Sequence, residues 1–293
     1  MKAILFANDE PEQSDRRMPP LGLLELPLYD QPALQYPIAN LMSWGIRQIL
    51  VLGPAPKLKR VLGDGSDYGL SLSYVSPAKK FDLFSLLQKH EEWIQGESLC
   101  LMAAHNFFWG DGLSVAEQMP GAATIVAKRM PGYEDYSWLE LDGQPWRVPD
   151  LGFYHPSVVE VSRNFKGTGS LSLDLEILNR HYAGQERLEV VRWGGEVSWC
   201  DLRNLDSLWQ IAHQAAAWEE MTETKAACLE EFALHMGLID AHRAVQLYDE
   251  YPPGRYRDYL ARVFVAGGIW PEEQRGLRLV EALDEPSVEQ PEH

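Results

Sequence analysis

The sequence predicts an α/β protein in which helices flank a mostly parallel mixed sheet and a helical part follows. Over the first hundred residues, short apolar runs alternate with amphipathic segments, which indicates repeated βαβ units. After Asp201 the apolar spacing becomes helical. With 293 residues, 45% of them hydrophobic, the chain can bury one large core.

The predicted elements follow in regular order along the chain. We expect strands at residues 3–6, 48–53, 70–74 and 99–103, and helices at 36–45, 57–62 and 82–94. Gly45 is typical of the residue after a helix, and Gly53-Pro54 ends the second strand. Residues 122–128 and 188–192 are expected to be further strands of the sheet.

The C-terminal third is predicted to be helical. Leu208, Ile211, Ala212 and Ala215 share one helix face, and further helices are expected at 229–236, 241–250 and 256–264. From residue 266 the chain is acidic and poor in apolar residues, with one short helix expected at 274–283. We therefore divide the chain into an α/β domain (1–208), a helical part packed on it (209–265) and a partly flexible acidic tail (266–293).

Composition excludes several functions. The 26 Lys and Arg against 43 Asp and Glu give a formal charge of −17, which repels polyanions and argues against a nucleic-acid partner. Three scattered cysteines argue for reduced thiols. No apolar run of about 18 residues and no signal peptide is present, so we expect a cytoplasmic protein without membrane contact.

Several motifs resemble one enzyme family. "LPLYDQPALQYPIANLMSWGIRQILVLG" and "LGDGSDYGLSLSY" are similar to segments of the sugar-1-phosphate nucleotidyltransferases, above all of their glucose-1-phosphate thymidylyltransferase branch. "NFFWG", "NRHY", "WCD", "EEFALHMGLID" and "YRDYL" follow in the family's order, up to about residue 264. The resemblance implies a Rossmann-like three-layer nucleotidyltransferase fold and transfer of a nucleotidyl group to a sugar 1-phosphate.

The family's phosphate loop is glycine-rich, and its place in this chain is acidic. By spacing from the first strand, the loop falls on Asn8, Asp9, Glu10, Pro11, Glu12 and Gln13. Gln13 stands at the loop arginine, and Leu23 stands at a lysine that neutralises phosphate. One carboxylate about 4 Å from a phosphate charge is unfavourable by roughly 4 kcal/mol. We therefore expect this loop not to bind a triphosphate as the family does.

The family's two metal aspartates correspond to His105 and Asp201. Mg²⁺ prefers oxygen ligands, so we expect no metal and no cofactor, with a hydrogen-bonded histidine favoured over a zinc site, for which two ligands are too few. Trp109 and Trp199 flank this position. No HExxH, HxH or GxSxG pattern offers another chemistry.

Other substrate contacts of the family are altered as well. "KKFDLFSLL" replaces the segment that closes over the sugar, and the family's E-E-K-P segment has no counterpart. Lys79, Lys80 and Arg147 are therefore candidate substitutes, or alternatively solvated surface charges.

A second, regulatory nucleotide site of the family corresponds to Gly110, Cys228, Glu230 and Glu231. Its G-R-G element is Gly194-Gly195-Glu196 here, and a later arginine position holds His235. The alternative for this region is a packed helix pair at an oligomer contact.

Three functional hypotheses follow from the sequence. The main one is a catalytically inactive family member that binds, regulates or scaffolds in sugar-nucleotide or polysaccharide metabolism, as a homodimer or homotetramer and with a sugar nucleotide as candidate ligand. The second is an active sugar-1-phosphate nucleotidyltransferase, Mg²⁺-dependent or with another metal, whose remodelled site uses Arg16, Arg17, His105 and Asp201. The third is a structural subunit of a hetero-oligomer with an active paralogue.

Overall fold

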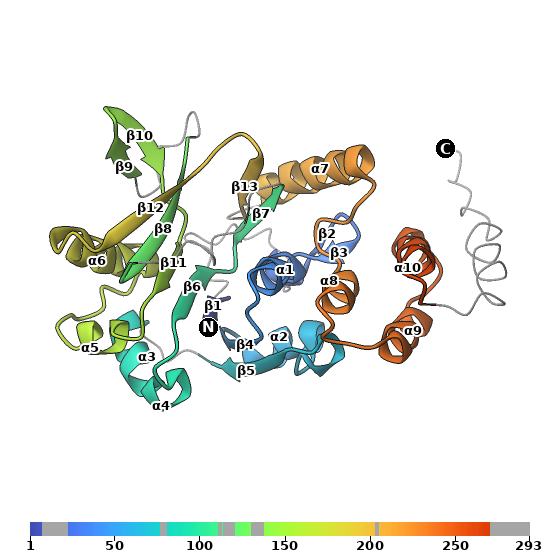
Figure 1. The fold of residues 1–293 in the computed structure, drawn as a ribbon, viewed down its shortest axis with the longest axis horizontal. Helices are drawn as coiled ribbons and strands as arrows, with labels where there is room; N and C mark the ends of the chain where they lie inside the picture. The colour runs from blue at the N-terminus through green and yellow to red at the C-terminus, as the bar shows by residue number, and fades with distance from the viewer. Residues whose placement is uncertain are drawn as a thin grey trace.

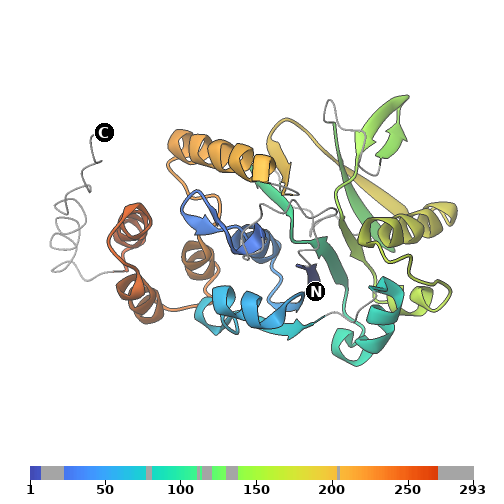
Figure 2. The same cartoon turned by 180° about the vertical axis from the view of Figure 1, so that it is seen from behind.

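A computed structural model describes residues 1–7, 23–76, 81–110, 113, 121–129, 138–202 and 205–269. Within these ranges the protein is a mixed sheet covered by helices on both faces, with further helices extending from one side (Figure 1). Figure 2 shows the same arrangement from behind. This confirms the predicted fold class.

The elements have the following bounds. The strands are β1 (Lys2–Phe6), β2 (Pro27–Leu28), β3 (Gln31–Pro32), β4 (Gln48–Leu52), β5 (Ser71–Val75), β6 (Leu99–Ala103), β7 (Asn106–Gly110), β8 (Ala123–Lys128), β9 (Trp138–Leu141), β10 (Gln144–Arg147), β11 (Leu151–Tyr154), β12 (Leu188–Trp193) and β13 (Val197–Asp201). The α-helices are α1 (Gln35–Ser43), α2 (Ala55–Leu62), α3 (Leu83–Lys89), α4 (Glu91–Ile94), α5 (Val158–Ser162), α6 (Leu171–Gly184), α7 (Leu205–Thr222), α8 (Leu229–His235), α9 (Ala241–Glu250) and α10 (Arg255–Ala266). The described part of the chain also has the 3-10 helices η1 (Leu23–Glu25) and η2 (Ser66–Tyr68).

Within the described ranges, the main sheet has nine strands in the order β5-β4-β1-β6-β11-β8-β10-β9, with β12 paired to β8. β5, β4, β1 and β6 are mutually parallel, and Leu5 of β1 lies between Val51 and Met102. β11 runs antiparallel to both β6 and β8, and β12 is parallel to β8. The carboxyl ends of β1, β4 and β6 therefore meet at one edge, where open α/β sheets bind ligands.

Alternate residues of the central strands face two separate cores. Ala3 and Leu5 of β1 belong to the core under α1, α2 and the C-terminal helices. Ile4 and Phe6 belong to the core under α3, α5 and α6. Because a strand buried on both faces needs apolar residues at every position, this arrangement explains the continuous apolar run "AILF". The result is three layers, with helices on each side of the sheet.

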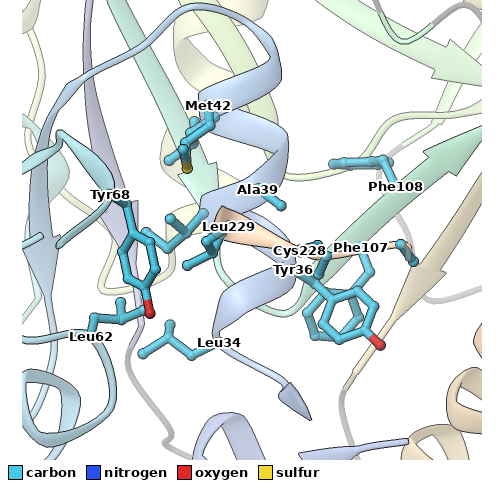
Figure 3. Close-up of a cluster of buried hydrophobic side chains, with 14 of the residues drawn as sticks. Leu34, Tyr36, Ala39, Met42, Leu62, Tyr68, Phe107, Phe108, Cys228 and Leu229 are labelled. Carbon is cyan, nitrogen blue, oxygen red and sulfur yellow. The ribbon is translucent and has the colours of Figure 1, made fainter. Parts of the chain in front are cut away.

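Helix α1 lies in the middle of the larger core. All of its residues except Ser43 are buried, and Figure 3 shows Tyr36, Ala39 and Met42 among side chains of α8 and β7. Gly45 adopts φ +74° just after the helix and donates its amide to Met42 O at 2.8 Å, as predicted for a C-terminal glycine. Asn40 Nδ2 donates to Phe108 O at 2.7 Å, and Phe108 N donates to Asn40 Oδ1 at 3.2 Å. Asn40 thereby joins α1 to β7.

Asn40→Ala is expected to lower the free energy of unfolding by about 2–3 kcal/mol, because both buried backbone groups of Phe108 lose their partner. Urea denaturation measures this change. Ser43→Ala on the same helix is the matched control, since its exposed hydroxyl bonds only within the helix, to Asn40 O, and it should stay within about 0.5 kcal/mol. Equal effects of the two substitutions would contradict the bridging role.

The structure also differs from the sequence prediction in detail. The helix expected over 82–94 is divided into α3 and α4 at His90, where the backbone leaves the helical region (φ −103°, ψ 18°). Strands β7, β9, β10, β11 and β13 were not predicted. The proposed boundary between residues 208 and 209 falls inside α7. Residues 274–283 lie outside the described ranges, and none of the described helices is long and apolar enough to cross a bilayer.

Candidate functional site

The candidate site lies at the carboxyl edge of β1 and β6. Phe6 and Ala103 are paired at the ends of these strands, and Ala104 N donates to Phe6 O at 2.9 Å. The chain leaves β1 here toward the predicted phosphate loop. That loop, Asn8, Asp9, Glu10, Pro11, Glu12 and Gln13, lies outside the described residues, as do Arg16 and Arg17.

The structure brings His105 and Asp201 together. His105 precedes β7, whose first residue, Asn106, pairs with Asp201 at the end of β13. Leu202 N donates to His105 O at 2.8 Å, which holds the two strand ends in register. His105 Nε2 lies 3.9 Å from Asp201 Oδ1. The two positions that correspond to the family's metal aspartates therefore share one site.

Asp150 is a third member of this site and was missed by the sequence analysis. Its Oδ2 lies 3.7 Å from His105 Nε2, and its carbonyl accepts the amide of Ala103 at 2.9 Å. Ser172, in the first turn of α6, donates its hydroxyl to Asp150 Oδ2 at 2.6 Å. The side chains of Asp150 and Asp201 are 10% and 3% exposed, against 32% for His105, so the imidazole is the accessible member.

This arrangement does not fit the family's magnesium ion. Mg²⁺ is bound by oxygen atoms at about 2.0–2.1 Å in an octahedral shell. Here an imidazole nitrogen lies between the two carboxyl groups, less than 4 Å from each. Among the residues that the structure describes, no group of three His, Cys, Asp or Glu side chains is placed to hold a metal ion.

The other residues at substrate-contact positions of the family lie on other elements or outside the described ranges. Leu23, at the position of the family's lysine, opens η1. Lys79 and Lys80 lie outside the described ranges, and Arg147 ends β10, where it pairs with Lys128. Both Trp109 and Trp199 are buried, and Trp199 Nε1 donates to Asn106 Oδ1 at 2.8 Å. These indoles support the β7–β13 pair next to His105.

Gly110, from the candidate regulatory site, ends β7 opposite Val197. It adopts φ +114°, and a Cβ atom there would lie 2.1 Å from the carbonyl oxygen of Glu196, so this position requires glycine. Glu196, in place of the family's G-R-G element, accepts the amide of Gly194 at 3.0 Å. Hydrogen bonds to backbone amides hold the pKa of this exposed carboxyl below its usual value.

The remaining residues of the candidate regulatory site form a buried cluster. Glu230 is 1% exposed, and it accepts the hydroxyls of Tyr251 at 2.6 Å and Tyr256 at 2.5 Å. Cys228 is fully buried beside it, and burial, followed by the charge of Glu230, raises the pKa of its thiol well above the usual value. Glu231 accepts the hydroxyl of Tyr259 at 2.5 Å. All three residues are engaged within the chain.

Chemically, the described part of the site offers an imidazole and two carboxyl groups. These groups can accept and donate hydrogen bonds, and carboxyl oxygens are suitable acceptors for hydroxyl groups. Two carboxyl groups, when ionised, carry more negative charge than the single imidazole between them can offset. The local charge is therefore unfavourable for a phosphate group.

A three-layer mixed sheet with a polar site at the carboxyl edge of its parallel strands defines a nucleotidyltransferase-like α/β protein. The chain is 30% identical over 261 residues to the glucose-1-phosphate thymidylyltransferase of Neisseria meningitidis, covering 81% of this chain and 90% of that protein. It is 28% identical over 260 residues to the Mycolicibacterium smegmatis enzyme, covering 81% and 90%. The chain belongs to the glucose-1-phosphate thymidylyltransferase family, which confirms the resemblance found in the sequence.

Solved structures agree on the fold. A Bacillus anthracis protein assigned as a glucose-1-phosphate thymidylyltransferase superposes with a TM-score of 0.60 at 16% identity, over 73% of this chain and 94% of the other. An apo UDP-glucose pyrophosphorylase gives 0.51 at 14% identity, over 75% and 99%. No family model matches the sequence.

Proposed function

We propose that this protein is a catalytically inactive member of its family. The observation that carries the proposal is the position of His105, whose imidazole stands at a family metal position with Nε2 within 4 Å of both Asp150 and Asp201. Nucleotidyl transfer in this family depends on a metal that organises the phosphates and stabilises charge in the transition state. A site without that metal lacks the main source of catalysis.

The sequence supports the same conclusion independently. The loop from Asn8 to Gln13 carries three carboxylates and a proline in place of the family's glycines and arginine. Each carboxylate near a phosphate would cost roughly 4 kcal/mol, or about three decades in affinity. Leu23 removes a further positive charge. These losses are separate, so restoring one of them should not restore turnover.

The retained scaffold supports a binding, regulatory or scaffolding role in sugar-nucleotide or polysaccharide metabolism. Such a protein would act in the cytoplasm, without a cofactor, a nucleic acid or a membrane, as a homodimer or homotetramer or in a hetero-oligomer with an active paralogue. Its ligand would be a sugar nucleotide held without Mg²⁺. Nucleotide binding at the candidate regulatory site, Gly110, Cys228, Glu230 and Glu231, stays a prediction. The buried carboxyl group of Glu230 there already accepts the hydroxyls of Tyr251 and Tyr256.

The reaction itself tests the proposal. The protein is incubated with dTTP, glucose 1-phosphate and Mg²⁺, and pyrophosphate release is followed. We expect no turnover above the rate without protein. Turnover near ordinary enzyme rates, about 1 s⁻¹ or more, would overturn the proposed inactivity. Co-purification from the native host then tests the hetero-oligomer. If that assembly exists, the active paralogue should be recovered together with this protein.

A remodelled enzyme is the second candidate, and the presence of Asp150 favours it. Asp150 adds a buried carboxyl to His105 and Asp201, so the site is not simply degraded. A thermal-shift panel of nucleotides, sugar nucleotides and divalent metals separates the two candidates. A metal-dependent stabilisation that His105→Ala abolishes would favour the enzyme.

A further inference from the structure

The position of the His105 ring is set by the backbone on both sides of it. Ala104 N donates to Phe6 O at 2.9 Å, and the carbonyl of His105 accepts Leu202 N at 2.8 Å. The residue is thus fixed between the end of β1 and the end of β13. A fixed backbone gives the side chain few positions, and the one observed directs Nε2 toward Asp150 and Asp201.

The two carboxyl groups are equally constrained. Asp201 belongs to β13 and is almost completely buried. Asp150 is held through its carbonyl by Ala103 N and through Oδ2 by the hydroxyl of Ser172. The β6–β11 and β7–β13 pairings therefore fix the backbone from which each carboxyl group extends toward the imidazole.

A cation bound by both carboxyl groups would need the volume that the ring fills. Metal–oxygen distances are about 2 Å, whereas Nε2 already lies 3.7 Å and 3.9 Å from the nearest carboxyl oxygens. An aspartate side chain is shorter than histidine, so it would vacate this volume and add two hard oxygen donors. A site of three carboxyl groups is the type that Mg²⁺ and Mn²⁺ prefer.

We infer that the imidazole of His105 occupies the cation position between Asp150 and Asp201 and excludes divalent metals from a site that keeps one family metal aspartate, Asp201, and gains the carboxyl group of Asp150. The inference rests on the proposed inactivity and explains it in part. A single substitution, His105→Asp, should then create a divalent-cation site without creating an enzyme, because Gln13 and Leu23 remain.

The test measures Mn²⁺ binding by electron paramagnetic resonance of the free aquo ion, with the full chain and without nucleotide. We expect no saturable Mn²⁺ binding by the wild type. For His105→Asp we expect saturable binding, with a dissociation constant at least about tenfold below any value that the wild-type data allow. Asp201→Asn in the same background should reverse the gain. His155→Asp, at an exposed histidine on the opposite edge of the sheet, is the matched control and should bind like the wild type.

Two results would overturn the inference. The first is saturable Mn²⁺ binding by the wild type that is lost in His105→Ala, because the imidazole would then be a ligand. The second is a folded His105→Asp variant, judged by circular dichroism, that binds no better than the wild type. If His105→Asp does not fold, His105→Asn vacates the same volume and supplies one neutral amide oxygen in place of a carboxylate, and the same criteria apply. Pyrophosphate release by the wild type would overturn the proposed function. The Mn²⁺ measurements would still decide separately whether His105 excludes the cation.

Discussion

Glu230→Ala is expected to lower the free energy of unfolding by about 3–5 kcal/mol, because the buried phenol of Tyr256 and the half-buried phenol of Tyr251 lose their carboxylate acceptor, and each unsatisfied group costs about 1–3 kcal/mol. The carboxylate on α8 accepts Tyr251, just after α9, and Tyr256, in α10. Helix α8 itself packs on α1 (Figure 3). The carboxylate therefore joins α9 and α10 to the α/β domain through α8. Urea denaturation of the variant measures the change in the free energy of unfolding.

Two variants make this prediction specific. Glu230→Gln keeps the shape and one oxygen, so we expect a smaller loss, about 1–2 kcal/mol. Glu220→Ala, an exposed carboxylate on α7, should change stability by less than about 0.5 kcal/mol. A loss below about 1 kcal/mol for Glu230→Ala would show that the tyrosines find other partners.

Lys225→Met is expected to cost about 3–5 kcal/mol, because it leaves two poorly hydrated carboxylates without their cation. The side chain of Lys225 is 8% exposed, and its Nζ binds Glu219 Oε2 at 2.7 Å and also Asp30. The ring centroids of Tyr29, Tyr256 and Tyr259 lie 5.0, 5.9 and 5.9 Å from Nζ. The lysine thus joins the "LPLYDQP" segment to the C-terminal helices.

Neutralising the two carboxylates should remove most of this cost, so Lys225→Met combined with Asp30→Asn and Glu219→Gln should be more stable than Lys225→Met alone. The exposed Lys59→Met is the control and should stay within about 0.5 kcal/mol. If the triple variant is the less stable one, the loss comes from packing and not from unpaired charge.

The same cluster predicts a pH dependence. Desolvation opposes the charge of Lys225, but its hydrogen bonds to Asp30 and Glu219 outweigh this and raise the pKa of Lys225. Burial raises the pKa of Glu219 even though Lys225 lowers it, so the carboxyl side of the ion pair is weakened by desolvation. Lys225 faces two carboxylates, so its own pKa governs the alkaline range. Its raised pKa stabilises the fold fully below the unfolded value of about 10.4 and less as pH rises through the folded value. The stability difference between the wild type and Lys225→Met should therefore shrink at alkaline pH.

Much of the parallel half of the sheet was predictable from local patterns. Residues 3–6, 49–52 and 99–103 are continuous apolar runs, and each lies in a strand whose apolar residues are buried on both faces. The antiparallel strands were missed because their pairing is set by distant segments. β11 contains Gly152 and lies in a Pro- and Gly-containing stretch, and β13 follows two glycines and includes polar residues.

The site was predictable in part for the same reason. Family motifs supplied His105 and Asp201, which the β7–β13 pairing then joined. Asp150 lies 45 residues after His105 in the sequence, and it reaches the site because β11 runs antiparallel to β6. A polar residue between Pro149 and an apolar strand was the available signal, and alone it does not specify a site.

A single-turnover experiment tests the central claim most directly. The protein, in excess over radiolabelled dTTP, is mixed with saturating glucose 1-phosphate and Mg²⁺, and labelled dTDP-glucose is separated and counted over hours. Because every nucleotide can meet a protein molecule, even slow transfer is detected, and a thymidylyltransferase of the family is the positive control. We expect no dTDP-glucose above the protein-free sample. Stoichiometric conversion of dTTP would contradict the account.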